Sequence, residues 1–142
     1  MHLILAQTDT TVGFLSQDSS RLNRVKGREE GKPYLKVFAS FKVLQEHTRI
    51  PLKYRIWVRH ARKTTFVIKN QAFRYVGNEP HSSLITKYGW LYSTSANESG
   101  KHFNRSFCEE HSDLIIEDVQ GFHEREPSKI FKLTSTQYKQ LR

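Results

Sequence analysis

The sequence predicts an α/β fold of the α+β type, in which helices pack on a twisted, mixed β-sheet. The chain of 142 residues fits one domain, residues 1–142. Expected strands and helices interleave irregularly and include one hairpin, which favours mixed strand directions. Aromatic residues make up 12% of the chain, whereas there are only seven glycines and four prolines, as in a chain that packs a core.

The first elements are predicted from an apolar run and a helix cap. Residues 2–7 form a short apolar run that ends in the polar turn 8–11, which predicts a buried strand. No basic segment precedes the run, so a strand is favoured over a signal peptide. Asp18 is a suitable N-cap for a short helix that ends near Val25. A second strand is expected over residues 34–39.

The middle of the chain predicts two helices and a hairpin. Ser40 is placed to cap one helix, and Pro51 suits the first position of another because its missing N–H has no partner there. Residues 64–69 are β-branched and aromatic, which favours a strand. A second strand over residues 72–76 follows after a gap of hairpin length.

The last third of the chain continues the irregular alternation. A helix is expected over residues 80–88, and Gly89 is a suitable cap for its C-terminus. An apolar strand follows over residues 90–94. The remaining expected elements are a helix over residues 105–111 and strands over residues 113–117 and 130–133.

The charge of the chain favours an anionic partner. There are 23 Lys and Arg against 14 Asp and Glu, a formal charge of +9. Such a charge suits nucleotide phosphates, RNA or an anionic membrane surface. No apolar run approaches the roughly 18 residues of a membrane span, so no membrane-spanning helix is expected, and no membrane is among the expected partners. A single cysteine excludes an internal disulfide and favours a reducing, cytoplasmic location.

Two clusters have the composition of a ligand site. Lys26, Arg28 and Lys32 lie within seven residues, and an arginine fork suits phosphate oxygens. No glycine-rich phosphate loop is present, so side-chain cations would hold a phosphate; the alternative is a solvated basic loop. Residues 93–100 follow an apolar strand and carry four hydroxyls and one carboxamide, which suits a polar ligand or an ordinary polar turn.

Other chemistries are not supported by the sequence. The seven histidines are scattered, with no pair at helical ligand spacing, so no metal site is predicted. Acidic neighbours would raise the pKa of Cys108, which argues against a nucleophilic cysteine. No Gly-x-Ser-x-Gly nucleophile turn occurs.

Taken together, the clusters and the first turn resemble a known family. Residues 7–14 (Gln-Thr-Asp-Thr-Thr-Val-Gly-Phe), Lys26-Gly27-Arg28 with Lys32-Pro33, and residues 93–100 (Ser-Thr-Ser-Ala-Asn-Glu-Ser-Gly) follow in order. They resemble the Pro-Thr-(Asp/Glu)-Thr-x-Tyr-Gly-Leu, Lys-x-Arg-Pro-x-x-x-Pro-Leu and Ser-Thr-Ser-Ala-Asn-x-Ser-Gly motifs of the YrdC-like threonylcarbamoyl-AMP synthases. Pro127-Ser128-Lys129-Ile130 and the final Leu141-Arg142 resemble the end of the family pattern.

The resemblance implies an activity, a fold and partners. Such enzymes form threonylcarbamoyl-adenylate and pyrophosphate from L-threonine, bicarbonate and ATP with Mg²⁺. Partner proteins then transfer the threonylcarbamoyl group to an adenosine of tRNA. The resemblance implies one YrdC-like domain with a basic concave face, and tRNA or double-stranded RNA as further partners.

The resemblance also implies roles for individual residues, in two groups. Its catalytic and nucleotide-binding positions are Lys26, Arg28, Lys32, Ser95, Asn97 and Arg142. Its threonine-side positions are Thr8, Thr65, Ser93 and Ser128.

This chain departs from the family pattern at several positions. Gln7 replaces the first proline, Val12 replaces the tyrosine, and residues 61–63 replace a Pro-Gly-Pro segment. The leading hypothesis is therefore a short, divergent threonylcarbamoyl-AMP synthase. The alternative is a YrdC-like module that binds RNA or nucleotide without catalysis.

Overall fold

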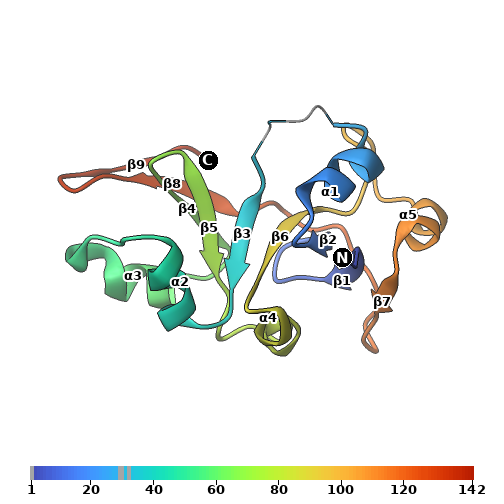
Figure 1. Cartoon of the computed structure of the whole chain (residues 1–142), viewed down its shortest axis with the longest axis horizontal. Helices are drawn as coiled ribbons and strands as arrows, with labels where there is room; N and C mark the ends of the chain where they lie inside the picture. The colour runs from blue at the N-terminus through green and yellow to red at the C-terminus, as the bar shows by residue number, and fades with distance from the viewer. Residues whose placement is uncertain (1, 29–30, 32) are drawn as a thin grey trace. The chain divides into compact units, whose positions relative to one another are not determined.

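The computed structural model describes residues 2–28, 31 and 33–142, and these form two compact units (Figure 1). Unit 1 contains residues 1–34 and 92–126, and unit 2 contains residues 35–91 and 127–142. Each unit contains both parallel and antiparallel strand pairs together with helices. The predicted α/β class with mixed strands is therefore confirmed. The single-domain boundary and the basic concave face stay predictions.

The strands of unit 1 are short and mostly buried. β1 (Ile4–Gln7) pairs antiparallel with β2 (Val12–Ser16) and parallel with β7 (Leu114–Ile116). β2 pairs antiparallel with β6 (Trp90–Ser95) from Tyr92 onwards. β1 and β2 are buried along almost their whole length, which explains their continuous apolar runs.

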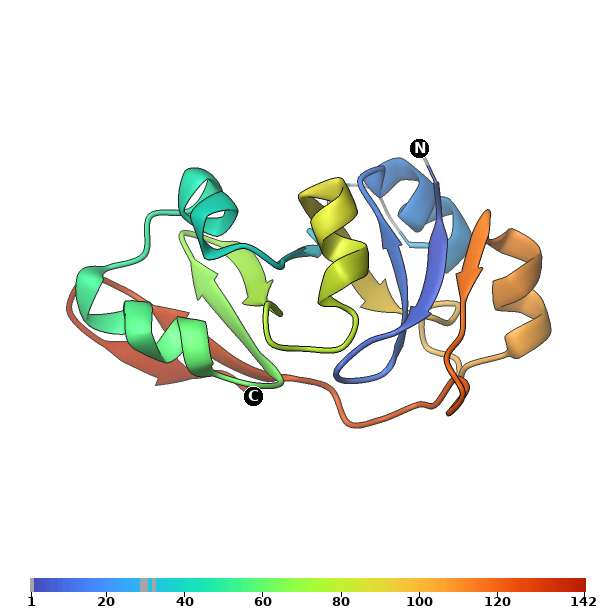
Figure 2. The same ribbon diagram turned by 90° about the horizontal axis from the view of Figure 1, so that it is seen from below.

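Two capped helices complete unit 1. α1 (Ser19–Lys26) begins where the Asp18 carboxylate accepts a hydrogen bond from the Arg21 N–H, as predicted. α5 (Arg105–His111) is capped in the same way by Asn104, and Figure 2 shows it next to β7. The buried core beneath these elements contains Leu3, Leu5, Val12, Phe14, Leu22, Val25, Tyr34, Ala96 and Cys108.

Unit 2 contains five strands. β3 (Leu35–Phe38) pairs parallel with β5 (Gln71–Tyr75), which forms the predicted hairpin with β4 (Thr64–Ile68). β4 pairs parallel with β8 (Lys129–Leu133), and β8 pairs antiparallel with β9 (Tyr138–Gln140). The hairpin turn has positive φ at its two central residues, the geometry that matches strand twist.

The helices of unit 2 begin close to their predicted positions. Ser40 caps α2 (Phe41–His47) through the Val43 N–H. Pro51 precedes a 3₁₀ turn, η1 (Leu52–Tyr54), which continues into α3 (Arg55–His60), and α4 (Ser82–Tyr88) ends at Gly89 as predicted.

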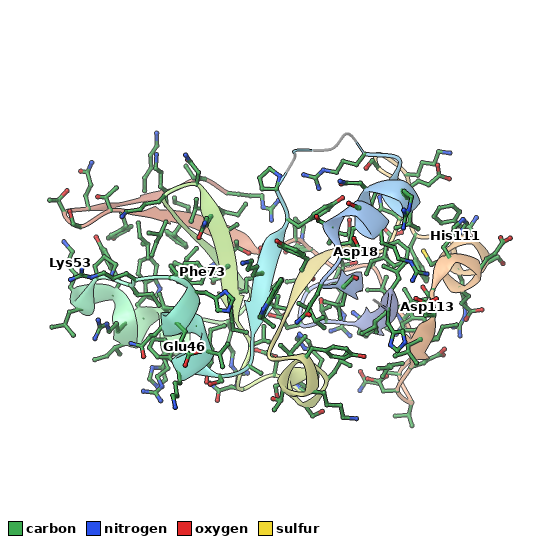
Figure 3. All side chains as sticks on the ribbon, viewed as in Figure 1. Asp18, Glu46, Lys53, Phe73, His111 and Asp113 are labelled. Carbon is green, nitrogen blue, oxygen red and sulfur yellow. The ribbon has the colours of Figure 1, made fainter. Side chains whose placement is uncertain are left out.

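Aromatic rings fill much of the core of unit 2. Phe66 and Phe73 stack with centroids 6.0 Å apart, and Trp57 meets Phe66 edge-on at 5.0 Å. Figure 3 labels Phe73 on β5. Burial of each such ring contributes about 1.5–3 kcal/mol, so this cluster holds α3 against the strands.

Candidate functional site

Lys26 is the last residue of α1, and the backbone leaves the helix at Gly27, directly after it. Gly27 caps the helix in the left-handed conformation with φ of 64°, which a residue with a Cβ adopts only under strain. The Arg28 N–H then donates to the Asn23 carbonyl at 3.0 Å. The Ser99 N–H donates to the Lys26 carbonyl at 3.0 Å, which joins this turn to the loop after β6.

The ammonium of Lys26 is held by the loop that follows β6. Its Nζ donates to the Ser95 carbonyl at 2.9 Å, to Asn97 Oδ1 at 2.9 Å and to Ser95 Oγ at 3.3 Å. The residue is only 5% exposed. The three acceptors can use all three donors of the ammonium, so its position is fixed before any ligand arrives.

The side chain of Asn97 is itself oriented by its surroundings. Its Nδ2 donates to the carbonyls of Glu98 at 2.7 Å and Lys101 at 2.6 Å. Ser95 Oγ donates to Asn97 Oδ1 at 2.6 Å. Oδ1 is therefore directed at the ammonium, and Lys26, Ser95 and Asn97 form one connected network.

The ammonium of Lys26 loses its proton more easily than a lysine in water does. Burial first, and the Arg28 guanidinium second, lower the pKa of Lys26 from 10.5 to about 8. An anion beside the ammonium would favour the charged form and raise this pKa again. The electrostatic environment of Lys26 therefore suits a negatively charged ligand.

An open hollow of about 550 Å³ lies over this network. It is lined by Lys26, Gly27, Arg28, Thr94, Ser95, Asn97, Ser99 and Gly100. We call it the Lys26 hollow. The described residues of its lining supply two cations, hydroxyls and backbone groups, and none of them has a carboxylate. A hollow of this size and polarity fits a phosphate-bearing group.

Arg28 is positioned by an aromatic ring. Its guanidinium lies 4.5 Å from the centre of the Tyr34 ring and donates to the Pro33 carbonyl at 3.2 Å. The Tyr34 hydroxyl donates to Asn23 Oδ1 at 2.6 Å, which fixes the ring. Tyr34 and Asn23 were not among the predicted site residues, because no motif in the sequence links them to Arg28.

Two further predicted residues lie in unit 1 but do not line the hollow. Thr8 is buried in the β1–β2 turn, where its Oγ1 donates to the Thr11 carbonyl at 2.6 Å. Ser93 is buried on β6 opposite Leu15 of β2. A Cβ on Gly13 would lie 3.1 Å from the Thr8 methyl group, so glycine at this position permits the turn to pack closely.

The other predicted residues form a second cluster within unit 2. Thr65 Oγ1 and Ser128 Oγ lie 2.7 Å apart, and both residues are buried. Arg142 Nε donates to the Ser128 carbonyl at 2.8 Å, and its Nη2 donates to Ser128 Oγ at 3.3 Å. The Ile130 N–H donates to the Arg142 carbonyl, so the chain end is tied to β8.

Most of the predicted residues thus fall into two sets, and Thr8 and Ser93 belong to neither. The structure brings Lys26, Arg28, Ser95 and Asn97 to one hollow, and it joins Thr65, Ser128 and Arg142 by hydrogen bonds. Lys32 lies outside the described residues. The roles assigned to all of these residues stay predictions.

Other reactive groups show no site in the described part of the chain. Cys108 is buried, its Sγ lies 3.4 Å from the Ala96 carbonyl, and burial raises the pKa of its thiol. Among the described residues, no group of three His, Cys, Asp or Glu side chains could hold a metal ion. The helices in the described ranges are all too short or too polar to cross a membrane.

Comparison with known proteins shows the fold. No protein-family model matches the chain, and no curated protein does. Solved structures match over 99% of the chain. P. abyssi Sua5 complexed with L-threonine gives a TM-score of 0.78 at 22% identity, and E. coli YciO gives 0.77 at 16%. MTH1692 from Methanobacterium thermoautotrophicum gives 0.72 at 22%.

The matched proteins differ in length from this chain. The chain covers 79% of MTH1692 and 82% of YciO but only 50% of the Sua5 protein. At these sequence identities the comparisons show the fold of the chain and nothing further. The fold of this chain is that of the YrdC/Sua5-like structures.

Proposed function

We propose that this protein is a threonylcarbamoyl-AMP synthase that uses L-threonine, bicarbonate and ATP. The observation that carries the proposal is the Lys26 hollow, in which Lys26, Arg28, Ser95 and Asn97 meet although the chain separates Lys26 from Asn97 by 71 positions. The motifs of the sequence and the YrdC/Sua5-like fold support the same activity.

The hollow supplies what adenylation requires. A carboxylate oxygen of threonylcarbamate attacks the α-phosphorus of ATP, the bond between that phosphorus and the bridging oxygen breaks, and pyrophosphate leaves. Negative charge grows on the leaving pyrophosphate, and Lys26 and Arg28 neutralise it. The remaining contribution is positioning of the two reactants, and no protein nucleophile takes part.

Mg²⁺ enters this proposal with the nucleotide. None of the described residues that line the Lys26 hollow has a carboxylate, so the phosphate oxygens would be the main ligands of the ion. The ion supplies additional neutralisation of phosphate charge when bound.

Hydroxyl-bearing residues are proposed for the amino-acid substrate. The four residues are buried, and their hydroxyls lie in local hydrogen-bond networks or on strands: Thr8, Ser93, Thr65 and Ser128. Arg142 is proposed to contact the nucleotide. The L-threonine complex of P. abyssi Sua5 supports threonine as the substrate. The proposal includes transfer of the product to proteins that modify tRNA, and it includes a cytoplasmic location.

A direct assay tests the proposal. The protein is incubated with ATP, labelled bicarbonate and L-threonine, and pyrophosphate and labelled adenylate are measured. Formation of both that depends on threonine is expected, and a Lys26→Ala variant should lose it. The matched control is Lys87→Ala, because Lys87 lies on α4 in unit 2 and does not line the Lys26 hollow.

A second candidate function is nucleotide binding without catalysis. It is favoured by residues 61–63, which form a basic segment before β4 where the family pattern has Pro-Gly-Pro; Lys63 there has a φ of 50°. ATP binding at the Lys26 hollow without threonine-dependent pyrophosphate release would support this candidate and refute the synthase.

A further inference from the structure

The charge of the chain is divided unequally between its two units. Unit 2 contains fifteen Lys and Arg and only two acidic residues, Glu46 and Glu79, for a formal charge of +13. Unit 1 contains eight Lys and Arg and twelve acidic residues, for a formal charge of −4. The basic excess of the protein therefore belongs to the unit without the Lys26 hollow.

Unit 2 has a large hollow of its own. It has a volume of about 910 Å³ and lies between the end of α2, the turn of the β4–β5 hairpin and the end of β8. We call it the hairpin hollow. It is lined by His47, Thr48, Arg49, Pro51, Ile68, Lys69, Asn70, Gln71, Lys132, Leu133, Thr134 and Ser135.

The hairpin hollow combines an apolar floor with a cationic rim. Ile68 and Leu133 are buried and lie at its base, whereas Arg49, Lys69 and Lys132 are exposed. The charged groups of these three side chains form no hydrogen bond or ion pair with another described residue. Neither acidic residue of unit 2 lines the hollow, so the rim has no carboxylate to neutralise it.

The walls of the hairpin hollow are fixed by packing. The His47 ring, which lines it, lies 5.2 Å from the Phe38 ring and 5.7 Å from the Trp90 ring, measured between centroids. Lys53, labelled in Figure 3, donates from Nζ to the Thr136 carbonyl at 2.8 Å and ties η1 to the β8–β9 turn. The hollow is therefore formed before a ligand binds.

We propose that the hairpin hollow binds a single-stranded nucleic acid, with backbone phosphates on Arg49, Lys69 and Lys132 and one base on the apolar floor beside His47. Three unpaired cations around an apolar floor suit a ligand that has both phosphates and a flat apolar part. The +13 charge of unit 2 exceeds what a mononucleotide needs and favours a polyanionic strand. The site is distinct from the Lys26 hollow and goes beyond the proposed synthase activity.

A pair of charge-matched triple variants tests the site. In the full chain, Arg49→Gln, Lys69→Gln and Lys132→Gln are combined, and the control combines Arg62→Gln, Lys42→Gln and Lys87→Gln. Both remove three charges from unit 2, but the control residues do not line the hollow. The probe is a fluorescent oligouridylate of about 12 nucleotides, measured by anisotropy.

The expected loss follows from counterion release. Three phosphate contacts contribute about two units to the slope of log K against log salt, so the hollow variant should bind roughly hundredfold more weakly in about 0.1 M salt. The control should weaken by no more than about threefold. Equal weakening of both variants, or no weakening of either, would overturn the proposal.

Three further measurements make the test independent of folding and of ligand size. The single variant Lys132→Gln should bind the oligouridylate about fivefold more weakly, the loss expected for one phosphate contact. Lys87→Gln should bind it less than about twofold more weakly. An abasic oligomer of the same length should bind at least about tenfold more weakly than oligouridylate. If inorganic tripolyphosphate competes as well as the strand, the hollow is a small-anion site and the proposal fails.

Discussion

Lys26 Nζ and Asn97 Oδ1 lie 2.9 Å apart, although 71 positions of the chain separate the two residues. Asn97 cannot turn its nitrogen toward the lysine without losing the hydrogen bonds that Nδ2 gives to the carbonyls of Glu98 and Lys101. The asparagine therefore presents an oxygen to a cation in the absence of a ligand. A phosphate would share that cation with the amide and would not have to attract it from solvent.

Replacing Asn97 with aspartate should weaken ATP binding. A carboxylate at this position would neutralise the Lys26 ammonium and repel phosphate, and we expect a loss of affinity of roughly tenfold or more. Asn78→Asp is the matched control, because Asn78 is exposed in unit 2 and lines neither hollow. Calorimetric titration with ATP would measure both, and equal Kd values would remove Asn97 from the nucleotide site.

ATP affinity should depend on pH near the pKa of Lys26, which burial and Arg28 lower to about 8. Bound phosphate favours the ammonium, so the cation is present below pH 8 and its contribution is lost as the pH rises through 8 toward 9. Binding near pH 8 should also take up protons, which titration in buffers of different ionisation enthalpy detects.

The Lys26→Arg variant is the control for this pH dependence, because a guanidinium stays protonated throughout the range. Its ATP affinity should be nearly flat between pH 7 and 9. A parent protein with the same flat profile would show that Lys26 does not hold the phosphate.

Arg28 should not be replaceable by lysine. Arg28→Lys removes the guanidinium fork and its stacking on Tyr34, and we expect ATP to bind about ten- to hundredfold more weakly. Arg24→Lys, on the exposed side of α1, is the matched control and should change little. ATP affinity of the parent should also fall with added salt because screening weakens the attraction. If Arg28→Lys changed the ATP affinity as little as Arg24→Lys does, the guanidinium of Arg28 would not be needed to bind a phosphate.

Local sequence signals predicted most of the elements, and the exceptions have physical causes. The cap residues Asp18, Ser40 and Gly89 set helix ends through bonds to nearby backbone, so a single sequence shows them. β2 was missed because Gly13 weakens its strand pattern, although β2 pairs with the neighbouring β1 as well as with the distant β6. β9 was missed because its residues, Tyr138–Gln140, are exposed and form a strand only by pairing with β8.

The cations of the candidate site could be predicted from the sequence, but the residues that position them could not. The resemblance of Lys26-Gly27-Arg28 and residues 93–100 to the motifs of one family predicted that these segments share a site, whereas their spacing alone left a solvated loop and an ordinary turn open. Tyr34 and Asn23, which position Arg28, were not predicted, because their role depends on the contacts of the Tyr34 ring with Asn23 and Arg28, which no sequence motif indicates. The hairpin hollow was also missed, since it joins side chains from three elements that are far apart in the sequence.

Asp113 should make the stability of the protein sensitive to strong acid. The Arg21 guanidinium, followed by the Leu3 N–H, lowers the pKa of Asp113 from 3.8 to about 2, and Figure 3 shows the residue at the start of β7. A lowered folded-state pKa stabilises the fold above pH 4, and that contribution is lost as the pH falls from about 4 to 2.

Thermal unfolding across this pH range measures the Asp113 contribution. Asp113→Asn should lower the melting temperature at pH 6 and leave a smaller difference from the parent at pH 2. Glu110→Gln, an exposed neighbour on α5, is the control and should show no such convergence. A pH-independent difference would mean that Asp113 acts by packing and not by its charge.

Arg142 should contribute to nucleotide binding although it is the last residue of this chain. Its guanidinium donates to Ser128 Oγ and to the Ser128 carbonyl, and its carbonyl accepts from the Ile130 N–H, so the chain end is anchored to β8. An anchored arginine loses little conformational freedom when it meets a phosphate. We expect a variant ending at Leu141 to bind ATP about ten- to hundredfold more weakly, the loss of one charge-assisted contact.

The control for Arg142 must remove one cation from the same segment without disturbing Ser128. Lys139→Ala does so, because Lys139 is exposed on β9 and pairs through its backbone with Lys132. Melting temperatures of both variants distinguish lost anchoring from lost binding: a shorter chain that melts earlier but binds ATP normally would assign Arg142 to the fold alone. Weaker ATP binding by the shorter chain, with Lys139→Ala unchanged, would assign Arg142 to the nucleotide, because the two variants differ in which cation is missing and not in how many.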